Sequence, residues 1–349
     1  MDSRTSGIRH AATREYPWER LADADLLRLR FCDLRLRVRD SLIWPEVEQL
    51  YAELERRGIP FRPHVWLSTE WFSPDGVPGI AVPFFAAHPR LNRLERRMAG
   101  EVEGGTSRWR LRILRHEAGH AIDTAFGLRR RADWRAVFGH ASKPYPGGYS
   151  ARPGSRSYVL HLGHWYAQSH PTEDFAETFA VWLQPRARWR RDYDGSPALG
   201  KLAFVDALMA EIAGRAPRYR DRSRIAPLAE NSRTLGEHYR REKARPDSVE
   251  RRYDAWLLRT FAPRARRPEA MPAGRYIREH RQRLRGALIR QDGVSPYLAE
   301  HTIERIRQRA GQLDLVLRGT SGDSLRPVLR LHERVVFDVL RRNREKYVL

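Results

Sequence analysis

The motif H-E-A-G-H at residues 116–120 constrains this chain more than any other feature of its sequence. Histidines four positions apart lie one above the other on an α-helix, so the imidazoles of His116 and His120 can face one metal ion. Apolar residues recur around the motif at helical spacing and predict a helix over Ser107–Phe126. Glu117 then lies beside the ion, where it can take a proton from a metal-activated water. The pattern therefore predicts a catalytic metal centre.

A catalytic zinc site needs three protein ligands and an open position, so a third ligand must come from elsewhere in the chain. The best candidates lie on a second predicted helix, Pro171–Leu183, where Glu173 and Glu177 border an apolar arc. Two half-buried carboxylates four positions apart are unfavourable unless each has its own cationic partner. We expect Glu173 to bind the metal and Glu177 to accept a hydrogen bond from a ligating imidazole. The alternative third ligands are His170 and Glu177.

The two motifs together resemble those of a known group of enzymes. The sequence H-E-A-G-H-A-I-D at residues 116–123 and E-D-F-A-E at residues 173–177 look like the gluzincin zinc peptidases. They are most similar to the lethal-factor-like clan, which carries H-E-x-G-H-A-[VI]-D and a later E-x-F-A-E. More broadly, the chain resembles bacterial proteins described only as zinc-binding metallopeptidases. The resemblance covers most of residues 20–215 and is weaker for the C-terminal third.

This resemblance implies a zincin-like fold, one zinc ion per chain and hydrolysis of peptide bonds, with Glu117 as the general base. In the clan, the first glutamate of the second motif binds zinc and the second orients a ligand histidine, which fits Glu173 and Glu177. A tyrosine lies seven residues before the ligand glutamate in the clan, and Tyr166 has that spacing. Its implied role is a hydrogen bond to the oxyanion of the reaction, and the alternative is a core aromatic residue. Asp123 is expected to support the ligands or to bond at the helix C-terminus.

The order of predicted elements indicates an α+β protein. Period-two alternation or short apolar runs predict strands over Leu26–Arg39, Arg62–Phe72, Gly79–Phe85 and Tyr158–Leu162. The run Gly79–Phe85 is interpreted either as a sheet edge that could pair with an extended peptide or as a buried central strand. On the helix that carries Glu173, we expect Asp174 and Thr178 to face solvent.

Composition divides the chain into four expected segments. After Gly214 the sequence becomes rich in Arg, Pro and Ala, and beyond this stretch only amphipathic helical patterns recur. The expected segments are an N-terminal tail 1–19, a zincin-like domain 20–215 with a small mixed sheet and the metal-binding helix, an Arg/Pro-rich linker 216–246, and an all-α accessory region 247–349.

The charge of the chain raises the question of a nucleic-acid partner. There are 65 basic and 43 acidic residues, and 61 of the basic residues are arginine, which leaves a net charge of +22. Such a surplus could serve nucleic-acid binding. However, the arginines are spread over the whole chain and form no compact tract interleaved with aromatic residues. A nucleic-acid partner is therefore possible but not favoured, and the resemblance to zinc peptidases implies a protein or peptide substrate.

Two other functions remain as alternatives: a nucleic-acid-associated zincin that acts on DNA-bound proteins, and a metal-binding module without activity. The intact Glu117 argues against the second. The sequence contains no run of about 18 apolar residues, so it predicts no membrane span. Cys32 is the single cysteine, which excludes an intramolecular disulfide. The first 20 residues lack the apolar core of a signal peptide. The expected location is the cytoplasm.

Overall fold

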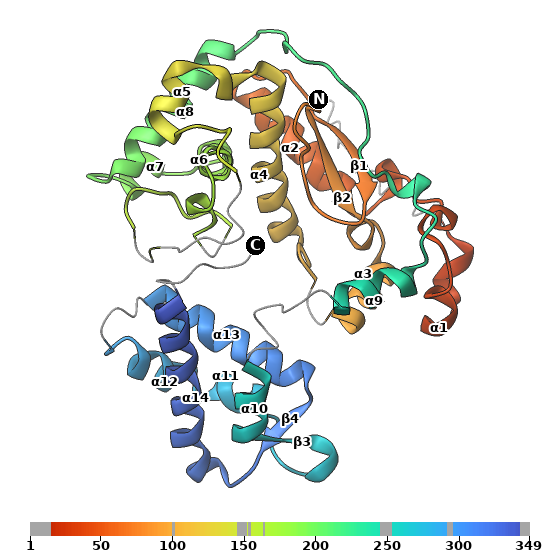
Figure 1. The fold of residues 1–349 in the computed structure, drawn as a ribbon, viewed down its shortest axis with the longest axis vertical. Coiled ribbons are helices and arrows are strands. Elements are labelled where there is room, and N and C mark those ends of the chain that lie inside the picture. Colours follow the sequence, from red (N-terminus) through yellow and green to blue (C-terminus); the bar gives the residue numbers. More distant parts are fainter. Residues whose placement is uncertain are drawn as a thin grey trace, which may run out of the picture. The chain divides into compact units, whose positions relative to one another are not determined.

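The computed structural model describes residues 15–99, 102–144, 152, 155–162, 165–244, 253–291 and 296–342. The chain is rich in helices, and the described residues form two small two-stranded sheets (Figure 1). Its contacts divide it into two compact units. The first comprises Met1–Ala141, Val159–Gly163 and Pro171–Lys243, and the second comprises Ser142–Tyr158, His164–His170 and Ala244–Leu349. None of the described helices is long and apolar enough to cross a membrane.

The first unit holds both predicted motif helices with the expected limits. Its regular elements are α1 Asp23–Leu26, α2 Trp44–Arg56, β1 His64–Ser68, β2 Gly79–Pro83, α3 Pro89–Ala99, α4 Ser107–Phe126, α5 Ala132–Phe138, α6 Pro171–Leu183, α7 Trp189–Asp192, α8 Pro197–Ile212 and α9 Leu235–Ala244. The ends of α4 follow from local chemistry. The side chain of Thr106 accepts a hydrogen bond from the Trp109 amide, and Gly127 adopts a left-handed φ of 66° that ends the helix.

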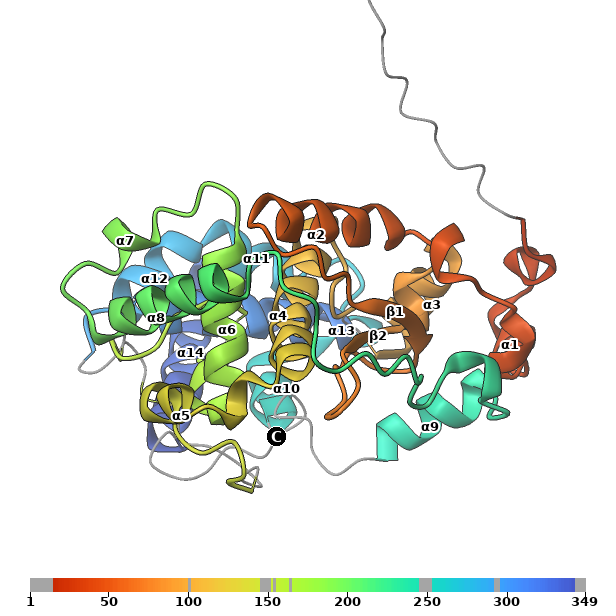
Figure 2. The same cartoon turned by 90° about the horizontal axis from the view of Figure 1, so that it is seen from above.

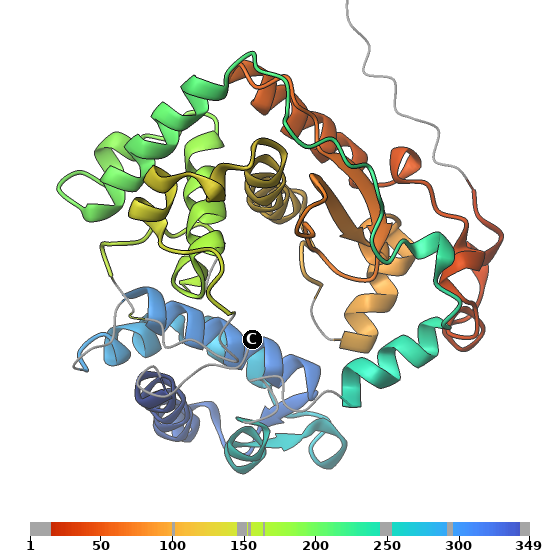
Figure 3. The same cartoon turned by 45° about the horizontal axis from the view of Figure 1, so that its top comes forward.

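Helix α4 lies at the centre of the first unit, with β2 and α2 on one side and α6 on the other (Figure 1). Two other views show the same order (Figures 2 and 3). Helix α6 packs in turn against α5 and α8. This position explains the burial of both motif helices, because apolar side chains on several faces of each helix contact a neighbouring element.

The small sheet of the first unit pairs β1 and β2 in parallel, from His64 opposite Gly79 to Ser68 opposite Pro83. On the other side of β2, the Ala81 amide donates to the Phe72 carbonyl at 2.8 Å, and the Phe72 amide donates back at 3.4 Å. All five residues of β2 are buried. The outward hydrogen-bonding groups of Ala81 are therefore occupied by the chain itself, which favours the buried-strand interpretation over an open edge.

Two of the predicted strands are wrong. The segment Leu26–Arg39 forms the end of α1 and two 3-10 turns, Phe31–Leu34 and Val38–Asp40. Its arginines alternate with apolar residues, but Leu26 is buried at the end of α1 and Phe31 at the start of a 3-10 turn. The segment Tyr158–Leu162 has no regular strand geometry. Alternating sequence therefore predicts exposure of the arginines better than it predicts strand geometry here.

The solvent-facing position expected for Asp174 and Thr178 is also wrong. Both side chains are buried, as are twelve of the thirteen residues of α6. The Thr178 hydroxyl donates to the Asp174 carbonyl oxygen at 2.6 Å, and Lys201 of α8 lies 2.6 Å from the Asp174 carboxylate. Burial raises the pKa of Asp174 to about 7, against the opposing effect of Lys201. Helix α8 covers the face that the sequence pattern left for solvent.

The second unit has its own apolar core, built from α10 Asp254–Thr260, β3 Phe261–Pro263, α11 Ala273–Glu279, α12 Arg281–Leu288, α13 Pro296–Gln312, β4 Leu315–Leu317 and α14 Ser321–Arg342. Strands β3 and β4 pair antiparallel, with Phe261 opposite Leu317. The expectation of an all-α region therefore misses a short sheet. Both strands have only three residues, which is too short for the period-two pattern to be visible in the sequence.

The expected tail and linker are partly built into the first unit. Residues 1–14 of the tail lie outside the described residues, but Trp18 is buried and its indole donates to the Leu34 carbonyl oxygen at 3.0 Å. Within the expected linker 216–246, α9 buries Leu235 and Tyr239 in the core of the first unit. The limits of the four segments stay a prediction.

Candidate metal centre

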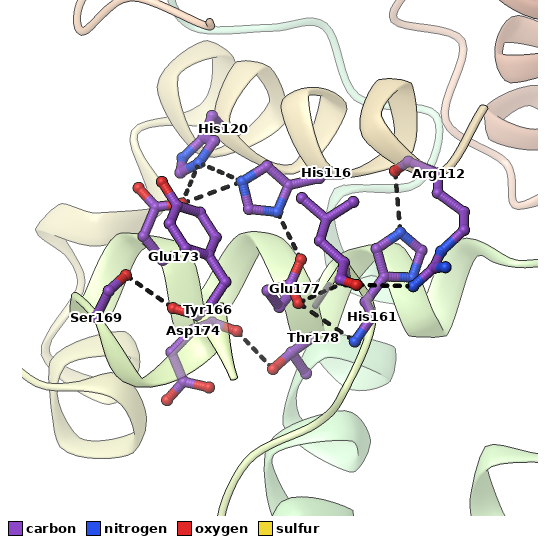
Figure 4. Close-up of polar contacts among 11 residues, drawn as sticks. Arg112, His116, His120, His161, Tyr166, Ser169, Glu173, Asp174, Glu177 and Thr178 are labelled. Atoms are coloured by element: carbon purple, nitrogen blue, oxygen red, sulfur yellow. Dashed lines mark hydrogen bonds and ion pairs between the residues drawn. The ribbon is translucent and has the colours of Figure 1, made fainter. Parts of the chain in front are cut away.

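Two helices supply the side chains of the candidate centre. Helix α4 presents His116 and His120, and α6 presents Glu173 opposite them (Figure 4). A close approach of the two backbones makes this arrangement possible. A Cβ atom added to Gly119 would lie 2.8 Å from the Cα atom of Ala176, so only glycine fits between the helices at this point.

Three potential ligand atoms converge on one point between the helices. The His116 Nε2 atom lies 3.0 Å from Glu173 Oε2, the His120 Nε2 atom lies 3.1 Å from the same oxygen, and the two nitrogens are 3.2 Å apart. Zinc bonds of about 2.0–2.1 Å at tetrahedral angles place ligand atoms roughly 3.3 Å from one another. His116, His120 and Glu173 therefore form a group that could hold a metal ion.

The second nitrogen of His116 shows which tautomer the site favours. His116 Nδ1 lies 2.9 Å from Glu177 Oε1, and both side chains are buried. When Nδ1 carries the proton and donates it to this carboxylate, the lone pair of a neutral imidazole lies on Nε2. That lone pair then faces the point shared with His120 and Glu173. A cation at this point gives all three atoms an attractive partner, so the donor set fits a metal ion.

Glu177 is itself held by backbone groups. Its Oε2 atom accepts hydrogen bonds from the His161 amide at 3.2 Å and from the Leu162 amide at 2.9 Å. The His161 ring is fixed in turn, because its Nε2 atom lies 2.9 Å from the Arg112 carbonyl oxygen. The irregular segment 160–162, which the sequence pattern predicts as a strand, thus positions the carboxylate that orients His116 (Figure 4).

The electrostatics of the group follow from burial and from close opposite charges. Burial works against a charged His116, but the hydrogen bonds that its ring donates to the carboxylates of Glu173 and Glu177 hold the pKa of His116 well above its ordinary value. Burial likewise opposes charge on Glu173, yet His120 and His116 hold the pKa of Glu173 well below its usual range. Burial also opposes charge on Glu177, but the hydrogen bond from His116 and the charge of His116 lower the pKa of Glu177. The site therefore stabilises carboxylates that face positive charge.

Glu117 has a different environment, although it lies on the same helix. Its side chain is buried, and burial raises the pKa of Glu117 despite the opposing influence of His116 and His120. A carboxylate with a raised pKa accepts a proton more readily than an exposed one. The structure thus places Glu117 next to the ligand group in a setting suited to proton transfer.

Asp123 and His170 do not belong to this group of ligand atoms. Asp123 accepts hydrogen bonds from the Arg129 amide at 2.7 Å and from its guanidinium at 2.5 Å, so it acts at the C-terminal end of α4. His170, an alternative ligand, places Nε2 2.9 Å from the Lys143 carbonyl oxygen. Tyr166 begins the 3-10 turn Tyr166–Gln168 of the second unit, and its role stays a prediction.

Sequence reasoning missed several supporting residues. The two amides that hold Glu177 have no sequence signature, because every residue except proline carries the same donor. Lys201 and Arg129 were equally hidden among the many basic residues, although each is the partner of a buried carboxylate. The carboxylates with which they pair, Asp123 and Asp174, lie within the two recognisable motifs at residues 116–123 and 173–177.

Comparison with known proteins agrees with this geometry. Residues 103–189 match a family model described as "Putative zinc-binding metallo-peptidase". The matched segment contains all of α4 and α6, and with them the complete His116, His120 and Glu173 group. No curated protein and no solved structure matches the chain. The match supports a metallopeptidase of the zincin kind, while the likeness to the lethal-factor-like clan stays a prediction.

Proposed function

We propose that this protein is a zinc-dependent peptidase that hydrolyses peptide bonds in a protein or peptide substrate. The observation that carries the proposal is the convergence of His116 Nε2, His120 Nε2 and Glu173 Oε2 within 3.0–3.2 Å of one another. The matching family model supports it. The proposed stoichiometry is one ion per chain, which the single group of this kind among the described residues supports.

The donor types favour zinc over the common hard cations. Calcium and magnesium prefer oxygen ligands, whereas two imidazole nitrogens and one carboxylate oxygen are a catalytic zinc set. Three protein ligands leave one position of a tetrahedral ion for water or substrate. The His116–Glu177 contact supplies the outer carboxylate that commonly orients a zinc-bound imidazole.

The proposed mechanism assigns each step of proton transfer to Glu117. Bound zinc would polarise the scissile carbonyl and lower the pKa of a water molecule towards neutrality. Glu117 takes the proton of the attacking water and later delivers it to the leaving amine. Its buried position suits both steps, because the raised pKa brings the carboxyl group closer to the pKa of its proton donor. Tyr166 is proposed to stabilise the oxyanion.

The test compares Glu117→Gln with Glu173→Ala and with the control Glu230→Gln, which changes an exposed glutamate on the surface of the first unit. We expect the purified wild type to digest a peptide library and to contain about one zinc per chain by mass spectrometry of the metal. Glu117→Gln should keep zinc and lose hydrolysis, Glu173→Ala should lose zinc, and the control should keep both. Full activity of Glu117→Gln would exclude the mechanism. A folded, zinc-loaded wild type without any peptide cleavage would favour a metal-binding module instead.

A further inference from the structure

A cavity of about 540 Å³ lies in the second unit, where α10, the end of β4 and α14 meet. Its lining combines apolar side chains with four arginines, Arg259, Arg318, Arg330 and Arg334. We propose that this basic cavity binds an acidic peptide segment of a partner protein, which inserts one large apolar side chain. The inference does not depend on the peptidase proposal, because every residue of the lining belongs to the second unit and none is a candidate metal ligand.

The charge of the basic cavity favours an anionic ligand. Asp323 is the carboxylate of the lining, and it accepts a hydrogen bond from the Thr320 hydroxyl at 2.6 Å. Among the described residues, none of the four arginines of the cavity forms an ion pair. Other carboxylates of this unit pair with arginines that do not line the cavity, namely Asp254, Glu279, Glu300, Glu304 and Asp314. The lining therefore carries four positive charges against one negative charge.

Two of the arginines are held in the wall of the cavity by groups that leave their charge unbalanced. The Arg318 Nη2 atom donates to the Leu258 carbonyl oxygen at 2.5 Å, and the Arg334 guanidinium lies 4.4 Å from the centroid of the Trp256 ring. Arg330 precedes Arg334 by four positions on α14, so the two lie on one helix face about 6 Å apart along the axis. Guanidinium groups restricted in this way suit charge-assisted hydrogen bonds to several carboxylates of one ligand.

The interior of the basic cavity suits an apolar side chain. Four of its lining residues belong to the apolar core of the second unit, namely Phe261, Leu317, Val328 and Leu331. The volume of about 540 Å³ lies within the usual range for ligand sites, roughly 300–1,000 Å³. There is thus room for one large side chain and for the backbone that carries it, with acidic neighbours placed beside the arginines.

The aromatic residues of the lining favour a peptide over a nucleic acid. Single-stranded nucleic acids bind basic grooves by stacking their bases on aromatic rings. The Trp256 ring already contacts the Arg334 guanidinium, and its centroid lies 5.4 Å from that of Tyr253. Phe261, the other aromatic residue of the lining, is fully buried. The basic cavity therefore offers arginines for anionic groups but no open ring for a base.

A proline in the wall also favours a ligand with amide groups. Pro327 lines the cavity inside α14 and has no amide hydrogen, so it cannot donate to the carbonyl oxygen of Asp323 four positions earlier. Asp323 lines the cavity as well. A peptide carries amide hydrogens that can bond to such a carbonyl group, whereas a simple carboxylic acid does not.

The experiment measures the fluorescence anisotropy of a labelled peptide, Glu-Glu-Phe-Glu-Glu, mixed with the full chain after removal of metal with a chelator. We expect one binding site per chain. The peptide Glu-Glu-Ala-Glu-Glu should bind about tenfold more weakly or less, because it leaves the apolar interior empty. Gln-Gln-Phe-Gln-Gln should be weakened as strongly, because it lacks the carboxylates. An oligothymidylate of five nucleotides should compete at least about tenfold less well than the unlabelled acidic peptide.

The double variant Arg259→Gln/Arg330→Gln removes two exposed charges from the basic cavity and should weaken binding of the acidic peptide about tenfold or more. The matched control Arg278→Gln/Arg283→Gln removes the same charge from exposed positions of α11 and α12 and should change the affinity less than twofold. If the first double variant does not fold, Arg330→Gln alone decides, and an unchanged affinity in that variant would contradict the proposal.

Four other results would overturn the proposal. Equal weakening in the two double variants would show that the net charge of +22, and not the cavity, attracts the peptide. Equal binding of the phenylalanine and alanine peptides would show that no apolar side chain is inserted. Equal or stronger competition by the oligothymidylate would make the cavity a nucleic-acid site. Binding that appears only with zinc would place the peptide at the candidate metal centre.

Discussion

The carboxylate of Glu177 shows how one buried residue can orient a metal ligand. It accepts hydrogen bonds from two backbone amides on one oxygen and faces His116 Nδ1 with the other. All of these contacts require an acceptor, and a carboxylate offers two acceptor oxygens. Glutamine offers only one acceptor oxygen. If its NH2 group faced the backbone amides, N–H groups would oppose each other, and if it faced His116, the imidazole would be forced into the other tautomer.

From this geometry we expect Glu177→Gln to weaken zinc binding by about 10- to 100-fold, the usual effect of losing the outer partner of a ligating histidine. Competition with a chromophoric chelator measures the affinity. Glu230→Gln, at an exposed position, is the control and should bind zinc like the wild type. An unchanged zinc affinity in Glu177→Gln would show that the His116 contact does not orient the ligand.

Glu95 predicts a pH dependence of stability away from the metal centre. Burial raises the pKa of Glu95 to about 7, although the Tyr239 hydroxyl donates to its Oε2 atom at 2.8 Å. Between its ordinary pKa and 7, the folded protein therefore holds a proton that the unfolded chain has released. The unfolded state binds fewer protons in this window, so the contribution of Glu95 to stability falls as pH rises and is lost above pH 7.

We expect Glu95→Gln to remove this slope. Urea unfolding measures the difference in free energy of unfolding between the wild type and Glu95→Gln at each pH. This difference should decrease between pH 5 and pH 8 by at most about 3 kcal/mol, because one pKa unit corresponds to about 1.4 kcal/mol. Glu230→Gln should show the same pH profile as the wild type. A difference between wild type and Glu95→Gln that stays constant with pH would contradict the assignment.

At the scale of elements, the contact of α4 with α6 determines whether the ligands meet. The two helices approach most closely where Gly119 faces Ala176. Because His116 and His120 lie on one helix and Glu173 on the other, any separation of the helices moves the carboxylate away from both imidazoles. Gly119 therefore has a structural role, because it allows the close helix contact that brings Glu173 to His116 and His120.

We expect Gly119→Ala to destabilise the fold by about 1–3 kcal/mol, the typical result of overpacking, and to weaken zinc binding as well. Gly200→Ala is a matched control, because Gly200 lies in the interior of α8 and an added Cβ there has no atom within 4 Å. That substitution should stabilise the fold by about 0.5–1 kcal/mol through helix propensity. Thermal unfolding and zinc titration of both variants give the comparison. Equal stability of the two variants would show that the helices adjust without cost.

At the scale of the whole molecule, the candidate ligands His116, His120 and Glu173 all belong to the first unit. The second unit has a separate apolar core around Phe261, Tyr276 and Leu284. Metal binding should therefore stabilise one unit and leave the core helices of the other unchanged.

Hydrogen exchange with and without zinc tests this expectation. A free zinc concentration of about 100 times the dissociation constant stabilises the binding unit by about 2.7 kcal/mol, so amide exchange in α4 and α6 should slow about 100-fold where it requires unfolding of that unit. Exchange in α13 and α14 should not change. A matching slowing of α13 and α14 would show that the two units unfold together.

The helical part of the site was predictable because its information is local. The i, i+4 spacing placed His116 beside His120, the limits of Ser107–Phe126 and Pro171–Leu183 agree with α4 and α6, and Glu173 was expected opposite the histidines. Strands were predicted less well. Only Arg62–Phe72 and Gly79–Phe85 contain strands, because strand pairing depends on partners distant in the sequence.

The sequence by itself determined the helix limits, the metal-ligand spacing and the chemical type of the site, since each depends on residues within one or two helical turns. Tertiary structure decided which groups hold those residues. The amides that bind Glu177 lie 15 and 16 positions before it, and Lys201, which pairs with Asp174, lies 27 positions after it. Such contacts arise from the packing of α6 against its neighbours and leave no periodic signal.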